Sequence, residues 1–161
     1  MPAPRAGKEA LSYTGRILSG ISSNVVGMTT KIASLRIITD DVARLVGFYE
    51  HVTGLTATWA TPDFAEIETP AFTLAIGSTR TVGIFAPGSA RPADNHSAIV
   101  EFLVDDVDAE YARLQQGELE FVNEPTTMPW GNRSLLVRDP DGTLVNLFTP
   151  VTEQAVAKWS R

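Results

Sequence analysis

The chain has 161 residues, of which 43% are hydrophobic and 20% are charged, and these proportions are typical of a globular domain rather than a disordered segment. Its formal net charge of −6, without any run of basic residues, argues against a nucleic-acid-binding surface. The absence of cysteine excludes disulfides and thiolate metal sites and fits a cytoplasmic protein. No apolar run approaches the roughly 20 residues that cross a bilayer, so we expect no membrane partner.

Composition divides the chain into three parts. The first 27 residues are rich in Gly, Ser, Ala and Pro, and we expect residues 1–27 to form a flexible N-terminal extension. Residues 28–152 have the alternating strand and helix patterns of one folded domain. We expect residues 153–161 to be a C-terminal tail.

A first module is expected over residues 31–86. A strand over Ile32–Thr39 is followed by Asp41, a natural helix N-cap, and by apolar residues at helical spacing up to a stop at Gly54. Three strand-like runs complete the module: Leu55–Ala60, Ala65–Glu68 with Phe72–Ile76, and Thr81–Phe85.

The same pattern returns over residues 97–150, after a Pro- and Gly-containing linker at 87–96. The strand Ala98–Val104 leads into an Asp-Asp-Val sequence that matches the one after the first strand, and this second helix ends at Gly117. Strands are then expected at Glu120–Asn123, Arg133–Arg138 and Thr143–Phe148. This internal repeat predicts an α+β fold of two βαβββ modules, with a curved mixed sheet around a shared cavity.

Three segments carry a resemblance to a known family. They are the aspartate before Phe48-Tyr49 with its helix and Gly54-Leu55, the run FLVDDVDAEYARL, and the turn and strand RDPDGTLVNLF. In this order and spacing they resemble the vicinal oxygen chelate superfamily, which includes glyoxalase I, extradiol dioxygenases and bleomycin-resistance proteins. The resemblance covers about residues 31–150. It implies a glyoxalase/bleomycin-resistance-like fold and a homodimer.

Metal-dependent members of that superfamily take four ligands, typically His, Glu, His and Glu, from the inner strands. Carried across residue by residue, the resemblance places these positions at Ser34, Gly83, Ile99 and Asn146. Divalent metals in such sites prefer imidazole nitrogen or carboxylate oxygen, and none of these four residues supplies either. We therefore expect no metal and no other cofactor.

Other residues are better candidates for ligand binding. If Ser34 and Ile99 face the cavity, the period of two along a strand places Arg36 and Glu101 on the same face. They would form a charge pair that orients a ligand or a structural ion pair, or both side chains would reach solvent at the strand ends. Tryptophans in loops can stack on a flat molecule, so we add three loop candidates: Trp59, Met128 and Trp130.

The sequence thus favours metal-independent binding of a small organic ligand, planar or aromatic, as in antibiotic or toxic-metabolite sequestration. An enzyme is the alternative: a glyoxalase-like lyase or isomerase, or a dioxygenase, with a displaced metal site or metal-free acid–base residues such as Glu101. A third interpretation is an interaction protein whose cavity is filled by its own side chains. Fold alone does not decide between them.

Overall fold

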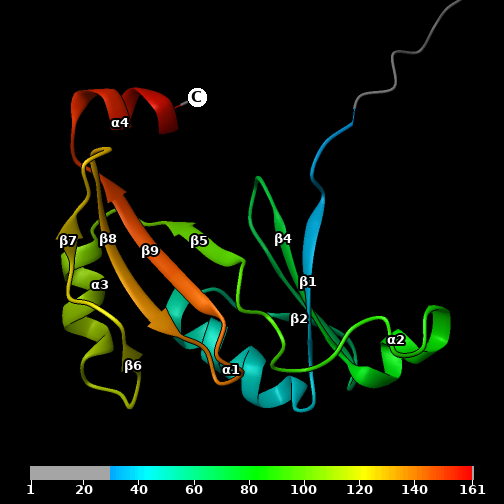
Figure 1. Ribbon diagram of the computed structural model, residues 1–161. Coiled ribbons are helices and arrows are strands. Elements are labelled where there is room, and N and C mark those ends of the chain that lie inside the picture. Colours follow the sequence, from blue (N-terminus) through cyan, green and yellow to red (C-terminus); the bar gives the residue numbers. More distant parts are fainter. Residues whose placement is uncertain (1–29, 161) are drawn as a thin grey trace, which may run out of the picture. The chain divides into compact units, whose positions relative to one another are not determined.

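A computed structural model describes residues 30–160 of the chain, and the extension predicted for residues 1–27 lies outside this part (Figure 1). None of the helices in the described part is long and apolar enough to cross a membrane. In chain order the elements are β1 (Ser34–Thr39), α1 (Val42–Thr53), β2 (Thr58–Thr61), β3 (Phe64–Glu68), β4 (Thr73–Ser78), α2 (Thr79–Phe85), β5 (Ile99–Leu103), α3 (Val107–Leu114), β6 (Glu120–Phe121), β7 (Thr126–Thr127), β8 (Asn132–Arg138), β9 (Leu144–Pro150) and α4 (Glu153–Trp159).

Helix α1 forms as its sequence predicts. The Asp41 carboxylate accepts a hydrogen bond from the Arg44 backbone N–H at 3.0 Å and caps the first turn. Gly54 ends the helix in the left-handed conformation, at φ 71°, which glycine adopts without a steric penalty. The apolar positions at helical spacing are all buried: Val42, Leu45, Val46, Phe48, Tyr49 and Val52.

The strands form two open sheets with related topology. One has the order β1-β4-β3-β2, and the other has the order β5-β9-β8-β6, with β7 paired to β8. In each, the first strand of the module pairs in parallel with the last and lies at the edge of its sheet. The mixed α+β class and the two-module repeat predicted from the sequence are therefore confirmed.

One predicted strand is wrong. Thr81–Phe85 belongs to the helix α2, because the fourth strand of the first module is already supplied by β4. The turn at Thr69, whose backbone N–H donates to the carbonyl of Phe72 at 2.9 Å, separates β3 from β4. Ser78 then caps α2 by accepting a hydrogen bond from the Arg80 N–H at 3.2 Å.

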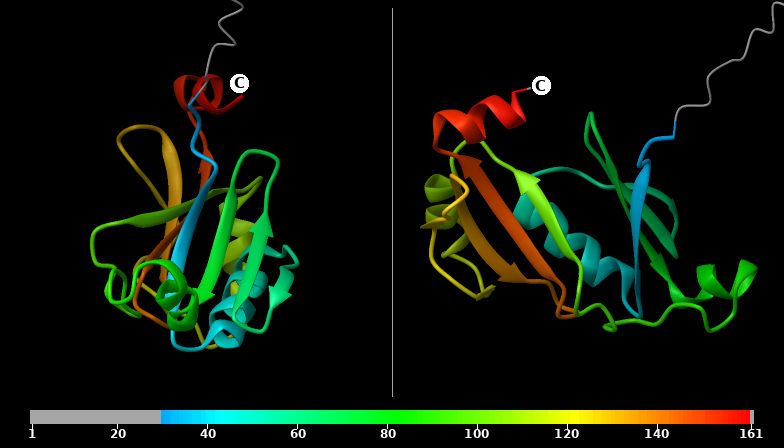
Figure 2. Two further views of the ribbon diagram at one scale, coloured as in Figure 1. Left: turned by 90° about the vertical axis from the view of Figure 1, so that its right-hand side faces the viewer. Right: turned by 45° about the horizontal axis from the view of Figure 1, so that its top comes forward.

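A single hydrophobic core joins the two modules. Figures 1 and 2 show α1 between the two sheets, and its buried side chains belong to the same cluster as Leu135, Val137, Val145 and Leu147 of the second sheet. Helix α3 is tied to α1 because the Arg113 guanidinium donates to the carbonyl oxygen of His51 at 2.8 Å. Each sheet therefore has one face against this core and one face that points away from it, which we call the open face.

Helix α4 occupies residues expected only as a C-terminal tail. Thr152 caps it, accepting a hydrogen bond from the Ala155 N–H at 3.3 Å. Near the other end, the ring of Trp159 packs on Phe148 of β9 with 5.1 Å between ring centroids. Phe148 lies on the open face of the second sheet, so α4 covers one end of that face (Figure 2).

Candidate functional site

The open face of the second sheet carries a row of polar side chains. Asn146 of β9 is in register with Glu101 of β5, and its amide N–H donates to the Glu101 carboxylate at 2.8 Å. Asn146 is only 8% exposed, whereas Glu101 and its strand neighbour Ile99 are exposed. The sequence prediction that Ile99, Glu101 and Asn146 share one face is consistent with this arrangement.

Several buried polar atoms on this face lack a partner among the described residues. They are Asn146 Oδ1, Ser134 Oγ and Asn132 Oδ1, and the three residues are between 3% and 9% exposed. Leaving a buried polar group unpaired costs about 1–3 kcal/mol, and native proteins contain few such groups. Three on one sheet face indicate a surface suited to hydrogen-bond with a bound molecule or ordered water.

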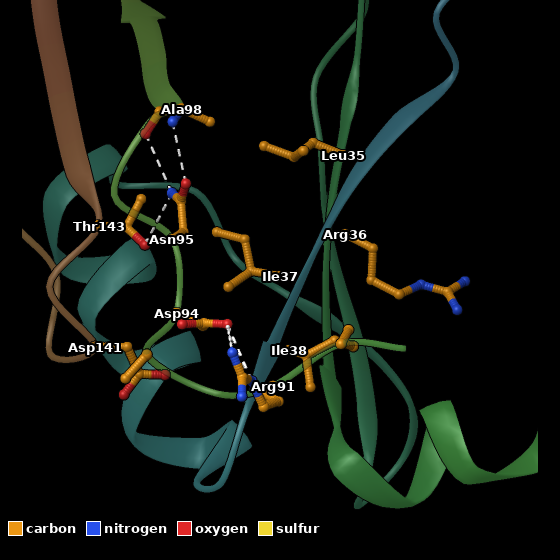
Figure 3. A pocket seen from close by; sticks show the side chains of 12 residues that line it. Leu35, Arg36, Ile37, Ile38, Arg91, Asp94, Asn95, Ala98, Asp141 and Thr143 are labelled. Atoms are coloured by element: carbon orange, nitrogen blue, oxygen red, sulfur yellow. Dashed lines mark hydrogen bonds and ion pairs between the residues drawn. The ribbon is translucent and has the colours of Figure 1, made fainter. Parts of the chain in front are cut away.

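The open face of the first sheet is more strongly charged. Its central row is Arg36, Ala75 and Glu66, which are in register across β1, β4 and β3. The Arg36 guanidinium lies 4.9 Å from the centroid of the Phe64 ring, a cation–π geometry. Figure 3 shows Arg36 pointing away from Leu35 and Ile37, which lie on the opposite face of β1.

Arg36 and Glu101 are equivalent in the two modules but do not form an ion pair in the described chain. Arg36 packs over Phe64, and the Glu101 carboxylate accepts the hydrogen bond from Asn146 instead. The reason is the placement of the shared core between the sheets, which directs the two open faces away from one another. The intramolecular charge pair is therefore not present.

The structure gives the place of each position that the resemblance assigns to a metal ligand. Gly83 lies in α2 and not on the fourth strand of its module, so its assignment to the second ligand position is wrong. Ala75 takes that place, because its register with Arg36 matches that of Asn146 with Glu101. The set Ser34, Ala75, Ile99 and Asn146 offers a hydroxyl and an amide but no imidazole or carboxylate, and the described residues contain no cluster of three metal-ligating side chains.

Of the three loop candidates, Trp59 lies apart from Met128 and Trp130. Trp59 lies on the edge strand β2 and is in register with Ala65 of β3. It therefore lies on the core-facing side of the first sheet and not beside Arg36. Trp130 is 67% exposed and lines a cavity with α4. Met128 lies in the same turn as Trp130, where its carbonyl accepts a hydrogen bond from the Gly131 N–H at 2.9 Å.

A second groove lies between the modules (Figure 3). It has a volume of about 330 Å³ and is bounded by β1, the linker and the turn after β8. Leu35 and Ile37 form its apolar wall, and Arg91 and Asp94 form an ion pair across its rim at 2.7 Å. Arg36 and Ile38 also border this groove, but the Arg36 side chain points to the other side of β1 from Leu35 and Ile37.

The turn Asp139–Gly142 places a buried carboxylate beside α1. Asp139 accepts hydrogen bonds from the Thr143 N–H at 2.8 Å, the Asp141 N–H at 2.9 Å and the Tyr49 hydroxyl at 3.0 Å. Burial nevertheless raises the pKa of Asp139, and burial beside Asp139 raises the pKa of Tyr49 far above its ordinary value. The hydrogen bond between Tyr49 and Asp139 therefore connects the two modules. The Tyr49 phenol stays protonated, and burial makes ionisation of the Asp139 carboxyl costly.

The raised pKa of Asp139 predicts a specific pH dependence. The folded state holds this proton more tightly than the unfolded state, so the contribution is fully present below the unfolded value of 3.8 and is lost as pH rises through the folded pKa. Asp139→Asn cannot titrate but keeps Oδ1 as acceptor for the two backbone N–H groups. We expect the wild-type free energy of unfolding, minus that of Asp139→Asn, to fall as pH rises from 3.5 to about 7 in urea titrations.

Asp108→Asn is the control for this experiment. The hydrogen bond from Arg133 lowers the pKa of Asp108, so the stability it contributes is present above 3.8 and lost as pH falls. The wild-type free energy of unfolding, minus that of Asp108→Asn, should therefore rise as pH rises. Its change should be smaller because Asp108 is exposed to solvent. A difference for Asp139→Asn that stays constant or rises with pH would contradict the assignment.

The sequence pattern did not single out three residues of the open face of the second sheet and α4. Trp159 falls in the expected C-terminal tail, Asn132 lies directly before the expected strand Arg133–Arg138, and Ser134 lies within it. The signal for the last two was present, because they alternate in NRSLLVR with the buried Leu135 and Val137. Polar residues at alternate positions of a largely buried strand indicate a face that does not pack on the apolar core.

Comparisons with known proteins agree with this geometry. Residues 31–147 match the family described as the Glyoxalase/Bleomycin resistance protein/Dioxygenase superfamily. A glyoxalase/bleomycin resistance protein/dioxygenase from Nocardioides is 25% identical with a TM-score of 0.65, over 80% of this chain and 89% of that one. A search of proteins with curated functions finds no match.

Two more distant structures share the fold. One is a glyoxalase/bleomycin resistance protein/dioxygenase family enzyme from Burkholderia phytofirmans, 16% identical with a TM-score of 0.65 over 76% of this chain and all (100%) of that one. The other is a glyoxalase-related enzyme from Fulvimarina pelagi, 18% identical with a TM-score of 0.64 over 75% of this chain and 88% of that one. At these identities the likeness concerns the fold alone.

Proposed function

Because this chain belongs to the Glyoxalase/Bleomycin resistance protein/Dioxygenase superfamily, we propose that it uses the open faces of its sheets to bind a small organic molecule without a metal. The observation that carries the proposal is Asn146. It stands where the resemblance puts a metal-binding carboxylate, and it is buried with Oδ1 unpaired among the described residues. An amide at that position can accept a hydrogen bond from a ligand but is a poor metal ligand.

The chemistry of the face defines the class of ligand. Asn146 Oδ1 and Ser134 Oγ offer hydrogen-bond acceptors to a donor group of the ligand, and the exposed Glu101 adds negative charge beside them. Ile99 provides an exposed apolar neighbour on the same face. We propose a planar or aromatic molecule that carries N–H or O–H donors, held for sequestration.

A second copy of the chain would complete the cavity. Strands β1 and β5 each have one unpaired side, and exposed strand edges in soluble proteins are normally covered or paired. In a homodimer, the open face of the first sheet of one copy can oppose the open face of the second sheet of the other. Arg36 would then approach Glu101 of the partner subunit, so the charge pair would form between chains and enclose the ligand.

Metal content and ligand binding test this proposal together. Untagged protein should contain metal only at background level by plasma mass spectrometry, before and after incubation with Ni, Zn, Mn and Fe(II). A panel of planar aromatic molecules should include binders that quench tryptophan fluorescence. Asn146→Leu, which removes the acceptor and keeps a similar volume, should weaken their binding about tenfold, equivalent to about 1.4 kcal/mol.

Arg36→Met provides a second variant on the opposite face. It should also weaken binding, and it should shift the dimer to monomer at low concentration in analytical ultracentrifugation. Near-stoichiometric tight metal would overturn the proposal in favour of an enzyme with a displaced site. Binding that is unchanged in both variants would show that the ligand lies elsewhere.

A further inference from the structure

A separate cavity lies between the Trp130 turn and α4. Its volume is about 570 Å³, within the range of small-molecule pockets. Two tryptophans form its aromatic walls, and two alanines of α4 complete the lining. The polar and aromatic side chains that line it are Trp130, Asn132, Gln154, Lys158 and Trp159.

Hydrogen bonds hold both walls in place. The Gly131 N–H donates to the carbonyl of Met128 at 2.9 Å, which closes the turn that presents Trp130. The carbonyl of Gly131 accepts from the Val151 N–H at 2.9 Å, directly before Thr152 caps α4. The separation of Trp130 from α4 is therefore set by backbone contacts, and the cavity is built before any ligand enters.

The floor of the cavity carries a side-chain amide with unused hydrogen-bonding capacity. Asn132 is 9% exposed, and its Oδ1 has no partner among the described residues. An asparagine amide presents a donor and an acceptor side by side, so it is complementary to a ring edge that presents an acceptor and a donor. The tryptophan walls favour a flat ring that stacks against them and directs its edge toward this amide.

Charge adds a further requirement. Lys158 is the one charged residue in the lining, and its ammonium lies 4.7 Å from the centroid of the Trp159 ring. An anionic group on a ring stacked near Trp159 would be close to this ammonium. We propose that the cavity is a binding site for a planar heteroaromatic acid, whose ring edge bonds to Asn132 and whose negative charge is near Lys158.

This site does not depend on the one at the dimer interface. Its lining comes from one chain, and none of Glu101, Ser134 and Asn146 belongs to it. A ligand bound here should therefore respond to changes at Asn132 and not at Asn146. The two proposals can fail separately.

Three probes test the ligand chemistry on the full-length protein. Pterin-6-carboxylate has the flat ring, the donor–acceptor edge and the negative charge; pterin lacks the carboxylate; and 2-naphthoate lacks the hydrogen-bonding edge. We expect pterin-6-carboxylate to bind most tightly by fluorescence titration. Asn132→Leu should weaken its binding about tenfold or more and leave 2-naphthoate unchanged, and Lys158→Met should weaken the two acids but not pterin.

The control variants separate this site from other causes. Asn146→Leu should leave pterin-6-carboxylate affinity within about twofold, whereas Trp130→Ala, an exposed position that does not threaten folding, should lower it at least fivefold. Circular dichroism and melting temperature verify folding of each variant. Absence of pterin-6-carboxylate binding, or equal binding by wild type, Asn132→Leu and Trp130→Ala, would overturn the proposal.

Discussion

Replacement of Tyr49 by alanine is expected to lower the free energy of unfolding by about 3–5 kcal/mol, the range for removal of a large buried aromatic side chain. Tyr49 is fully buried in α1, at 0% exposure. Its ring packs edge-on against Phe48, at 5.2 Å between centroids, and near Phe102 of β5, at 6.3 Å. The substitution therefore opens a cavity where the first module meets the second.

The hydroxyl of Tyr49 can be tested apart from its ring. Tyr49→Phe keeps the packing but removes the donor to Asp139, and it should cost about 1–3 kcal/mol because a buried carboxylate oxygen loses its partner. Tyr111→Phe is the matched control. Its ring packs edge-on against Phe121 at 5.2 Å, but its hydroxyl makes no hydrogen bond among the described residues, so we expect a change below about 0.5 kcal/mol.

Urea unfolding of the three variants, followed by circular dichroism, measures these differences. The unfolding transition should stay single and cooperative for the folded domain, since one core serves both modules. If Tyr49→Phe is no more destabilising than Tyr111→Phe, the bond to Asp139 does not couple the modules. Two separate transitions in Tyr49→Ala would show that the modules can unfold independently.

The elements with strong local signals could be predicted from the sequence. The cap at Asp41, the stop at Gly54 and the apolar spacing between them agree with one another, so α1 was predictable in position and buried face. The repeated Asp-Asp-Val likewise located α3, where Asp106 accepts hydrogen bonds from the N–H groups of Asp108 and Ala109. Local and tertiary preferences coincide in these segments.

Other features depend on contacts that no local pattern contains. Thr81–Phe85 has β-branched residues that suit a strand, but β4 already occupies the sheet position and Ser78 caps a helix instead. The face of the sheet on which Trp59 lies follows from its register with Ala65, and a shift of one residue would reverse it. The placement of α4 depends on contact between Trp159 and Phe148, and Trp159 lies outside both repeated modules.

The same dependence on tertiary contact affects the four positions that the resemblance assigns to metal ligands. Asn146 and Ile99 are located by turns and caps near them in sequence, and the structure keeps them on one open face. The position on the fourth strand of the first module had no such marker. It was therefore assigned to Gly83, and the register across β1 and β4 identifies Ala75 instead.

Gly131→Ala adds only one methyl group, but we expect it to lower the free energy of unfolding by about 2–5 kcal/mol. Gly131 has φ +90°, a backbone conformation that residues other than glycine rarely adopt. An added Cβ would also clash with the Thr152 side chain. Backbone strain at positive φ accounts for about 1–2 kcal/mol of this loss. The clash adds the rest, because Thr152 is fixed as the cap of α4.

Gly142→Ala separates these two causes. Gly142 has a similar φ of +88°, but a Cβ there would meet nothing within 4 Å. It should therefore show the strain alone, about 1–2 kcal/mol. If the two variants are equally destabilised, contact between the Trp130 turn and the start of α4 does not contribute.

Gly131→Ala should also change the cavity between Trp130 and α4. Displacement of Thr152 moves the start of the helix, so Trp159 should lose part of its packing on Phe148 and its fluorescence should shift to longer wavelength. Pterin-6-carboxylate affinity should fall in Gly131→Ala and stay within about twofold of wild type in Gly142→Ala, measured where both proteins are folded. The ligand site and the stability of α4 would then have one structural origin, the close approach of Gly131 to Thr152.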